Sequence, residues 1–164
     1  MGHNGRLFLT PGVLTQCYST SVVSGNGCVG GLVGTNWGGT VTRCYSTGSV
    51  SGNDWVGGLV GYYIAGSVTQ CYSTGAVSGK DGVGGLVGCS YLGILSQCFW
   101  DTQTSGQTQS AGGTGKTTAE MQMAKTFLDA GWDFVGETAN GTKDIWWLLE
   151  GKDYPRLWWE AAKK

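Results

Sequence analysis

Charge, proline and histidine are all scarce in this chain of 164 residues. Charged side chains make up 13% of it, against a typical share of about 25%, and 10 basic residues face 11 acidic ones. This balance generates no extended positive field, so we expect no nucleic acid and no anionic lipid surface as a partner. Apolar runs are short as well, and none approaches the ~20 residues of a membrane-spanning helix. We therefore expect no membrane span in this chain.

Histidine occurs once, at His3. Zinc hydrolases need two or three histidine ligands, and serine or cysteine hydrolases need an imidazole base. The scarcity of histidine argues against all of these enzymes. We therefore expect a protein that is not an enzyme and that holds no cofactor.

Glycine, in contrast, is abundant, with 31 residues. Collagen would require glycine at every third position together with much proline, and this chain has only 2 prolines. Disorder would require low hydrophobicity and a high net charge. This chain is instead 40% hydrophobic and 12% aromatic, with a net charge of -1. The composition thus predicts a folded protein that is neither collagenous nor disordered.

The order of the residues has a fixed period. Four cysteines, each 27 residues from the next, mark it: Cys17, Cys44, Cys71 and Cys98. The tetrapeptide Gly-Leu-Val-Gly recurs with the same spacing at 31–34, 58–61 and 85–88. No insertion or deletion interrupts the register between the first and the last of these cysteines. A constant period of this length is typical of stacked repeat architectures.

The composition of the repeat indicates its kind. Each unit is rich in glycine, and a glycine inside a helix costs about 1 kcal/mol relative to alanine. Short β-branched fragments bounded by glycine are typical of strands of about 4–6 residues, and three of them per unit predict one coil of a β-solenoid. We expect an all-β fold, a right-handed parallel β-solenoid of about 3.5 coils over residues 1–102. Because Val41 and Cys44 are three positions apart, strict alternation cannot bury both, and a bend is expected between them.

A second region follows the repeats. Of the 21 charged residues, 16 lie after residue 100, and the period lapses there. Residues 103–116 have the composition of a loop or linker. Residues 117–164 are rich in tryptophan and predict a short helix, begun by Thr117 or Thr118 and ended by Gly131, and then two strands. We interpret this α+β region as a cap that covers the exposed end of the last coil.

The repeats resemble a known motif. The sequences GGLVG, CYSTG and VSG, over about residues 10–100, are similar to the GLUG motif of bacterial surface and secreted proteins. The resemblance implies export, a bacterial cell-surface or extracellular location, and a structural or adhesin-like role. Some members of the family also carry a peptidase domain that cleaves immunoglobulin A, but the repeat is not that peptidase and supplies no catalytic residues. The first twelve residues lack the apolar core of a signal peptide, so any export signal is expected outside this chain.

Aromatic residues are the candidates for ligand binding. One column of the repeat holds Tyr18, Tyr45 and Tyr72, and an exposed row of rings would stack on sugar faces or anchor a protein. The alternative is a buried ladder that fills the solenoid. Trp37 and Trp55 interrupt other columns and are the further binding candidates.

Two aspartates occupy one column of neighbouring repeats. Asp54 and Asp81 would lie close together, as paired carboxylates of a polysaccharide-cleaving enzyme do. They are also the only candidate for a weak calcium site, although such sites need more oxygen ligands than this pair offers. The alternative is that both are turn residues. No other metal site is expected.

The cysteine column has two interpretations. Residues Cys17, Cys44, Cys71 and Cys98 would stack about 4.8 Å apart, and parallel side chains would hold their Cβ atoms slightly too far apart for a disulfide. We favour a structural ladder of buried free thiols over disulfides.

These features give three hypotheses of function. The first is a non-catalytic extracellular structural or adhesion module, and it includes self-association because only Arg6–Leu9 precede the first coil as a possible cover. Its expected partners are another copy, joined head to tail or edge to edge, or a glycan or protein of a cell surface. The second is a carbohydrate-binding module that uses the aromatic column. The third is a polysaccharide-active enzyme that uses Asp54 and Asp81.

Overall fold

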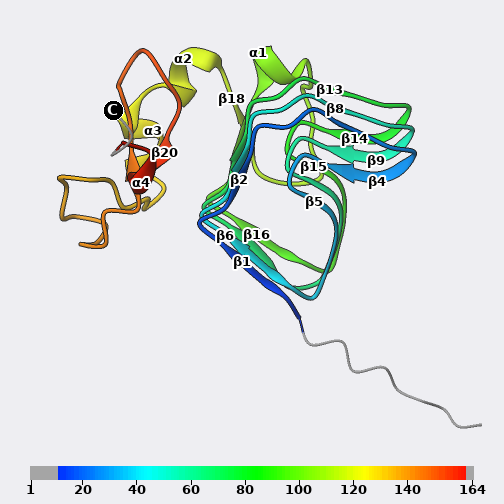
Figure 1. Ribbon diagram of the computed structural model, residues 1–164, viewed down its shortest axis with the longest axis horizontal. Helices are drawn as coiled ribbons and strands as arrows, with labels where there is room; N and C mark the ends of the chain where they lie inside the picture. Colours follow the sequence, from blue (N-terminus) through cyan, green and yellow to red (C-terminus); the bar gives the residue numbers. More distant parts are fainter. Residues whose placement is uncertain (1–10, 162–164) are drawn as a thin grey trace, which may run out of the picture.

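A computed structural model describes residues 11–161 and shows a parallel β-solenoid of about 3 turns followed by a C-terminal region of short elements (Figure 1). Each strand pairs with the strand 27 residues away, as in the pairs Leu14–Val41 and Val41–Val68. The predicted all-β solenoid is therefore present. The expected cover of the first coil by Arg6–Leu9 lies outside the described residues.

Each coil contributes a strand to each of five parallel sheets. The first two sheets contain β1 (Val13–Thr15), β6 (Thr40–Thr42), β11 (Ser67–Thr69) and β16 (Ile94–Ser96), and β2 (Tyr18–Ser19), β7 (Tyr45–Ser46), β12 (Tyr72–Ser73) and β17 (Phe99–Asp101). The other three contain β3 (Val23–Ser24), β8 (Val50–Ser51) and β13 (Val77–Ser78); β4 (Gly27–Gly30), β9 (Asp54–Gly57) and β14 (Asp81–Gly84); and β5 (Val33–Trp37), β10 (Val60–Ile64) and β15 (Val87–Tyr91). A full coil thus has five short strands where three longer ones are predicted, because glycine corners divide it more finely.

The bend expected between Val41 and Cys44 is a corner made by one residue. Arg43, between β6 and β7, has φ 55°, which is the left-handed region that reverses the inward and outward alternation of a strand. Both Val41 and Cys44 consequently point inward and are buried. The corresponding residues of the other coils, Gln16, Gln70 and Gln97, have the same conformation.

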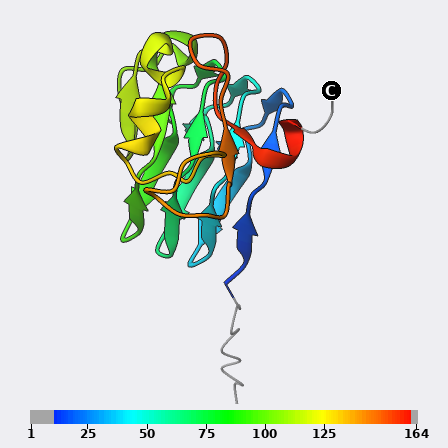
Figure 2. The same cartoon turned by 90° about the vertical axis from the view of Figure 1, so that its left-hand side faces the viewer.

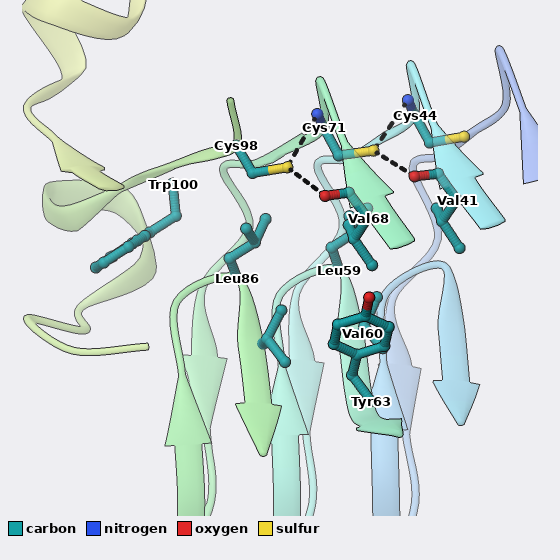
Figure 3. Close-up of a cluster of buried hydrophobic side chains, with 11 residues drawn as sticks. Val41, Cys44, Leu59, Val60, Tyr63, Val68, Cys71, Leu86, Cys98 and Trp100 are labelled. Atoms are coloured by element: carbon teal, nitrogen blue, oxygen red, sulfur yellow. Dashed lines mark hydrogen bonds between the residues drawn. The ribbon is translucent and has the colours of Figure 1, made fainter. Parts of the chain in front are cut away.

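The interior of the coils holds a large apolar cluster (Figure 3) and a smaller one of valines, Val29, Val50, Val56 and Val77. Leu59 and Leu86 project into the large cluster from the Gly-Leu-Val-Gly corners, and Tyr63 enters it from β10. Its phenol donates a hydrogen bond of 2.8 Å to the carbonyl of Ile94, so the one hydroxyl in this cluster is satisfied.

The glycines of the Gly-Gly-Leu-Val-Gly corner allow backbone to meet backbone. A Cβ atom on Gly57 would lie 2.0 Å from the carbonyl oxygen of Val60, and one on Gly58 would lie 2.2 Å from the carbonyl oxygen of Gly85. Both contacts are with main-chain atoms, which have no room to move. Only glycine fits at these two positions.

Residues 103–116, predicted to be a loop or linker, close the end of the last coil. They contain the end of α1 (Thr102–Ser105) and β18 (Thr114–Lys116), which pairs in parallel with β17. Between them, Gly85 donates a 3.0 Å hydrogen bond to Gln109, and Ala111 donates one of 2.9 Å to Val87. This segment therefore satisfies the strand edges that would otherwise be exposed.

Residues 117–161, predicted to be that end cap, instead lie along one side of the solenoid (Figure 2). The elements of this lateral cover are α2 (Thr118–Met121), α3 (Ala124–Leu128), β19 (Trp146–Trp147), β20 (Arg156–Leu157) and α4 (Trp158–Ala161). The cover begins beside the last coil and ends with α4 beside the first one. The expected cap is thus divided into a short end cap and a longer lateral cover.

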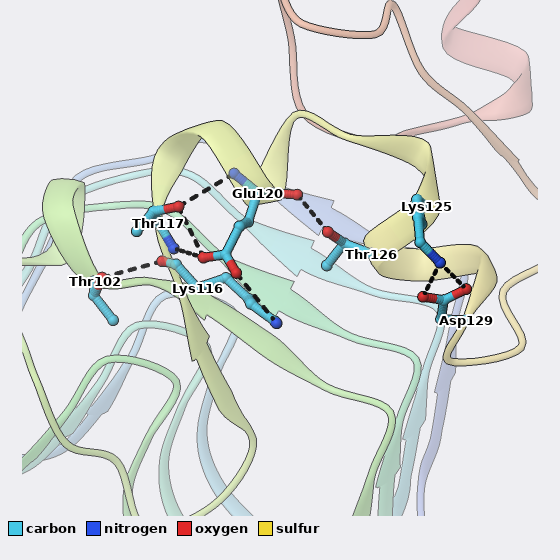
Figure 4. A network of polar contacts seen from close by, with 7 residues as sticks. All are labelled: Thr102, Lys116, Thr117, Glu120, Lys125, Thr126 and Asp129. Atoms are coloured by element: carbon cyan, nitrogen blue, oxygen red, sulfur yellow. Dashed lines mark hydrogen bonds and ion pairs between the residues drawn. The ribbon is translucent and has the colours of Figure 1, made fainter.

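The single helix predicted after Thr117 is split in two. Thr117 is the N-cap of α2 and forms a capping box with Glu120, and Lys116 and Thr126 join the same polar network (Figure 4). Two residues that are not helical, Gln122 and Met123, then separate α2 from α3. Of the two predicted strands, only the second forms, as β19, which pairs with β20, whereas the first contributes an isolated bridge at Phe134.

One buried carboxylate joins the three parts of the molecule. Asp101, at the end of β17, is 0% exposed. It accepts hydrogen bonds from the amides of Gln103 and Thr104 at 2.8 and 3.1 Å, and from the hydroxyls of Thr118 and Tyr154 at 2.7 Å each. These four donors compensate the burial of its charge. They connect the last coil with the end cap and the lateral cover.

We predict that Gly57→Ala lowers the free energy of unfolding by about 3 kcal/mol, because the new methyl group would overlap the Val60 carbonyl. Gly12→Ala is the matched control, since a Cβ atom there meets nothing within 4 Å. Denaturant unfolding of both variants measures the difference. Equal stability of the two would contradict the tight corner.

Candidate functional site

The aromatic column forms a stacked ladder. The rings of Tyr18 and Tyr45 lie 5.1 Å apart at 7°, and those of Tyr45 and Tyr72 lie 5.0 Å apart at 6°. Phe99 continues the column on β17. These distances follow the spacing of paired strands, about 4.8 Å. The ladder lies outside the solenoid interior, on the sheet that the lateral cover contacts.

The lateral cover buries most of this ladder. Tyr45, Tyr72 and Phe99 pack into one cluster with Trp132 and Trp146, both 0% exposed. Tyr18, in the first coil, remains 41% exposed. Two of the three predicted binding tyrosines therefore have their rings inside the molecule, where the cover occupies the place of a ligand.

The hydroxyls of the buried tyrosines also have partners. Tyr45 donates to the carboxylate of Glu160 at 2.8 Å, and Tyr72 donates to the carbonyl of Pro155. Burial is the largest cause that raises the pKa of each phenol, and for Tyr45 the hydrogen bond to Glu160 adds to it. Burial and the hydrogen bond to Asp101 likewise raise the pKa of Tyr154 to about 12. The three phenols stay protonated at neutral pH and act as donors that fasten the cover.

A cleft of about 230 Å³ remains where the cover meets the first coils. The exposed ring of Tyr18 forms one wall, and Arg156 and Asp153, paired at 2.7 Å, lie on the other. Glu160 also lines the cleft and accepts the hydrogen bond of Tyr45. The cleft therefore has one carboxylate more than it has positive groups.

The two predicted tryptophans belong to a different surface. Trp37 lies at the end of β5 and Trp55 on β9, and they are 68% and 41% exposed. Trp55 stacks on Tyr62 of β10 with ring centroids 4.8 Å apart. Tyr91 of β15, which the sequence reasoning does not single out, is 60% exposed. The sequence contains one signal that could have identified Tyr91: it follows Trp37 by 54 residues, which is two full periods of the repeat.

Comparison with protein families decides what the coils are. The family model described as the GLUG motif matches residues 25–51 and 56–78, which include strands of every sheet of the solenoid. The chain carries the GLUG motif. Comparisons with curated proteins and with solved structures gave no significant match. The resemblance of the repeats to GLUG sequences is thus confirmed.

The aspartate pair occupies an open corner of the GLUG coils. Asp54 and Asp81 are register partners at the starts of β9 and β14, and both are exposed. In the first coil, Gly27 takes their place. Within residues 11–161, no group of three or more His, Cys, Asp or Glu side chains is arranged so that it could hold a metal ion. Both aspartate side chains are exposed to solvent, as those of turn residues usually are.

The cysteine column of the GLUG coils is a continuous ladder inside the solenoid (Figure 3). The amide of Cys44 donates to the sulfur of Cys71 at 3.4 Å, and the amide of Cys71 donates to that of Cys98 at 3.4 Å. The Cys71 thiol in turn donates to the carbonyl of Thr69 at 3.2 Å. Burial raises the pKa of the Cys71 thiol well above its ordinary value. The sulfurs of Cys44, Cys71 and Cys98 thus each accept a hydrogen bond from the amide of the cysteine one coil earlier.

The helices of the described part are short, and none of them has the length and apolar character of a membrane span.

We predict that Tyr72→Ala lowers the free energy of unfolding by about 3–5 kcal/mol, since it removes a buried ring from the contact between solenoid and cover. Tyr18→Ala, at the exposed end of the same ladder, is the matched control and is expected to cost less than about 1 kcal/mol. Urea unfolding followed by tryptophan fluorescence compares them. Equal losses would show that the ladder is not covered.

We predict that a thiol reagent distinguishes the six cysteines. Cys44, Cys71 and Cys98 are buried, whereas Cys17, Cys28 and Cys89 are half-buried. Iodoacetamide should therefore label only the second group in the native protein and all six in urea, because the buried thiols are inaccessible to the reagent and burial also raises the pKa of Cys71. Peptide mass spectrometry reads the positions. Rapid native labelling of Cys71 would contradict the ladder.

Proposed function

We propose that this chain is a non-catalytic structural and adhesion module that acts outside the cell and associates with a second copy through its first coil. The observation that carries the proposal is the difference between the two ends of the solenoid. The last coil is hydrogen-bonded on both sides, to the preceding coil and to residues 109–116. The strands of the first described coil pair on one side only, with β6 to β10.

The side chains of the first coil support the same proposal. Val13 and Val22 are 70% and 80% exposed, and Leu14 and Tyr18 are also exposed. The outer face of the Tyr18 ring is the free end of a ladder in which Tyr45 is stacked on both sides. Unpaired strand edges beside apolar side chains favour pairing with another β-edge.

The closed end restricts the form of the association. A head-to-tail filament would require the first coil of one copy to reach strand edges that the end cap of the next already pairs. We therefore expect the first coils of two copies to meet through the same surface, so that the assembly is a closed dimer. The GLUG motif supports the extracellular setting, because it resembles repeats of exported bacterial proteins.

We predict that the mass in light scattering rises with concentration from 17.2 kDa towards twice that value. The double variant Val13→Lys/Val22→Lys should remain monomeric, because charges on strand edges oppose pairing. Val135→Lys, at a residue of the lateral cover that is 54% exposed, is the matched control and should still associate. A wild-type protein that stays monomeric at millimolar concentration would refute the proposal.

A further inference from the structure

A second exposed surface lies on the outer face of the sheet formed by β5, β10 and β15. In β10, Tyr63 points into the core and is 0% exposed. Since side chains alternate along a strand, its neighbours Tyr62 and Ile64 point outward. The register aligns Ile64 with Trp37 on one side and Tyr91 on the other. We call Trp37, Trp55, Tyr62, Ile64 and Tyr91 the aromatic face.

This aromatic face is uncovered in the described part of the chain. The lateral cover lies on the opposite side of the solenoid, against the ladder (Figure 1). Trp37 and Tyr91 are 68% and 60% exposed, and Leu92, directly after β15, is 80% exposed. Single exposed apolar residues are common, but several together mark a binding surface.

The geometry at Trp55 shows that the aromatic face is built and not merely exposed. Trp55 has φ 54°, a conformation that bulky residues rarely adopt. Its indole lies against Tyr62 and over Gly82, where a Cβ atom would come within 2.7 Å of the Trp55 Cδ1 atom. Cys28 and Gly82, 27 residues away on either side, have the same conformation, so it belongs to the repeat. The stacked partner and the glycine that makes room are what hold this exposed ring in place.

Charge and spacing define the chemistry that fits. The aromatic face carries no charged side chain, so it favours a neutral ligand. The electron-rich faces of tryptophan and tyrosine rings pack on the apolar C–H faces of sugar rings. Trp37 and Tyr91 are separated by two strand spacings, about 10 Å along the solenoid axis, with Ile64 between them. The row is straight because the register is constant.

We propose that the aromatic face binds a neutral linear glycan that lies along the solenoid axis, with sugar rings on Trp37 and Tyr91 and with Trp55, on β9, contacting it from beside this row. This inference names a ligand for the adhesive part of the proposed function and does not depend on the first coil. Asp54 and Asp81, both exposed, lie beside Trp55 and Gly82 at the edge of the face, and their negative charge disfavours an acidic ligand.

Native gel electrophoresis in the presence of polysaccharides tests the proposal. Hydroxyethyl cellulose, galactomannan and glycogen serve as neutral probes, and alginate serves as the acidic one. We expect at least one neutral probe to slow the wild-type protein and alginate not to. Trp37→Ala and Trp55→Ala should each weaken the retardation about tenfold. Trp158→Ala, which removes a 50% exposed tryptophan from the lateral cover, is the matched control and should change nothing.

Several results would overturn the inference. They are mobility unchanged by every neutral probe, retardation that Trp37→Ala leaves intact, and retardation by alginate alone. A fall in the scattering mass of Trp37→Ala would assign the aromatic face to contact between copies. The variant Val13→Lys/Val22→Lys should retain glycan binding, so failure of self-association and failure of glycan binding are distinguishable. Unchanged unfolding midpoints of the tryptophan variants show that the fold is intact.

Discussion

The structure depends on one constraint, the backbone hydrogen bonds between parallel strands whose register partners are 27 positions apart. Tyr45 donates to Cys17 at 3.1 Å, Tyr72 to Cys44 at 3.1 Å and Phe99 to Cys71 at 3.0 Å. Since the register never slips, each side chain has its counterpart one strand spacing away, about 4.8 Å. Stacked rings, aligned thiols and aligned outer residues all follow from it. A single inserted residue would shift every later column and turn inward side chains outward.

The same constraint requires unusual backbone at the corners. A left-handed residue such as Arg43 costs about 1–2 kcal/mol, and this cost recurs in every coil. It is offset because the corner directs both Val41 and Cys44 into the core, where their burial is favourable. The cysteine then supplies a sulfur acceptor to the amide of the corresponding cysteine in the preceding coil. Each coil therefore repeats the same combination, a strained corner residue and the buried side chains whose packing offsets its cost.

The sequence predicted what the period controls and missed what it does not. The solenoid, the bend before Cys44 and the thiol column all come from the spacing of residues within the repeat. The end cap was missed because residues 107–113 have no periodic pattern, and their pairing with Gly85 and Val87 is through main-chain atoms and the Ser110 hydroxyl. The direction of the lateral cover was missed for a related reason. Tryptophans predict that residues 117–161 bury an apolar surface, but only the structure shows that this surface is the tyrosine ladder.

The tyrosine ladder and the aromatic face differ in burial, since the lateral cover buries most of the ladder and leaves the aromatic face exposed. An uncovered row of tyrosines would be an apolar strip along the whole solenoid, and the lateral cover removes it by placing Trp132 and Trp146 against Tyr72. The chain thus devotes a large part of its length to burying one aromatic row. It leaves the other, with Trp37 and Tyr91, exposed on the opposite side. Because both rows arise from the same register, they differ only in that one is covered and the other exposed, and it is the exposed row that we propose as a binding surface.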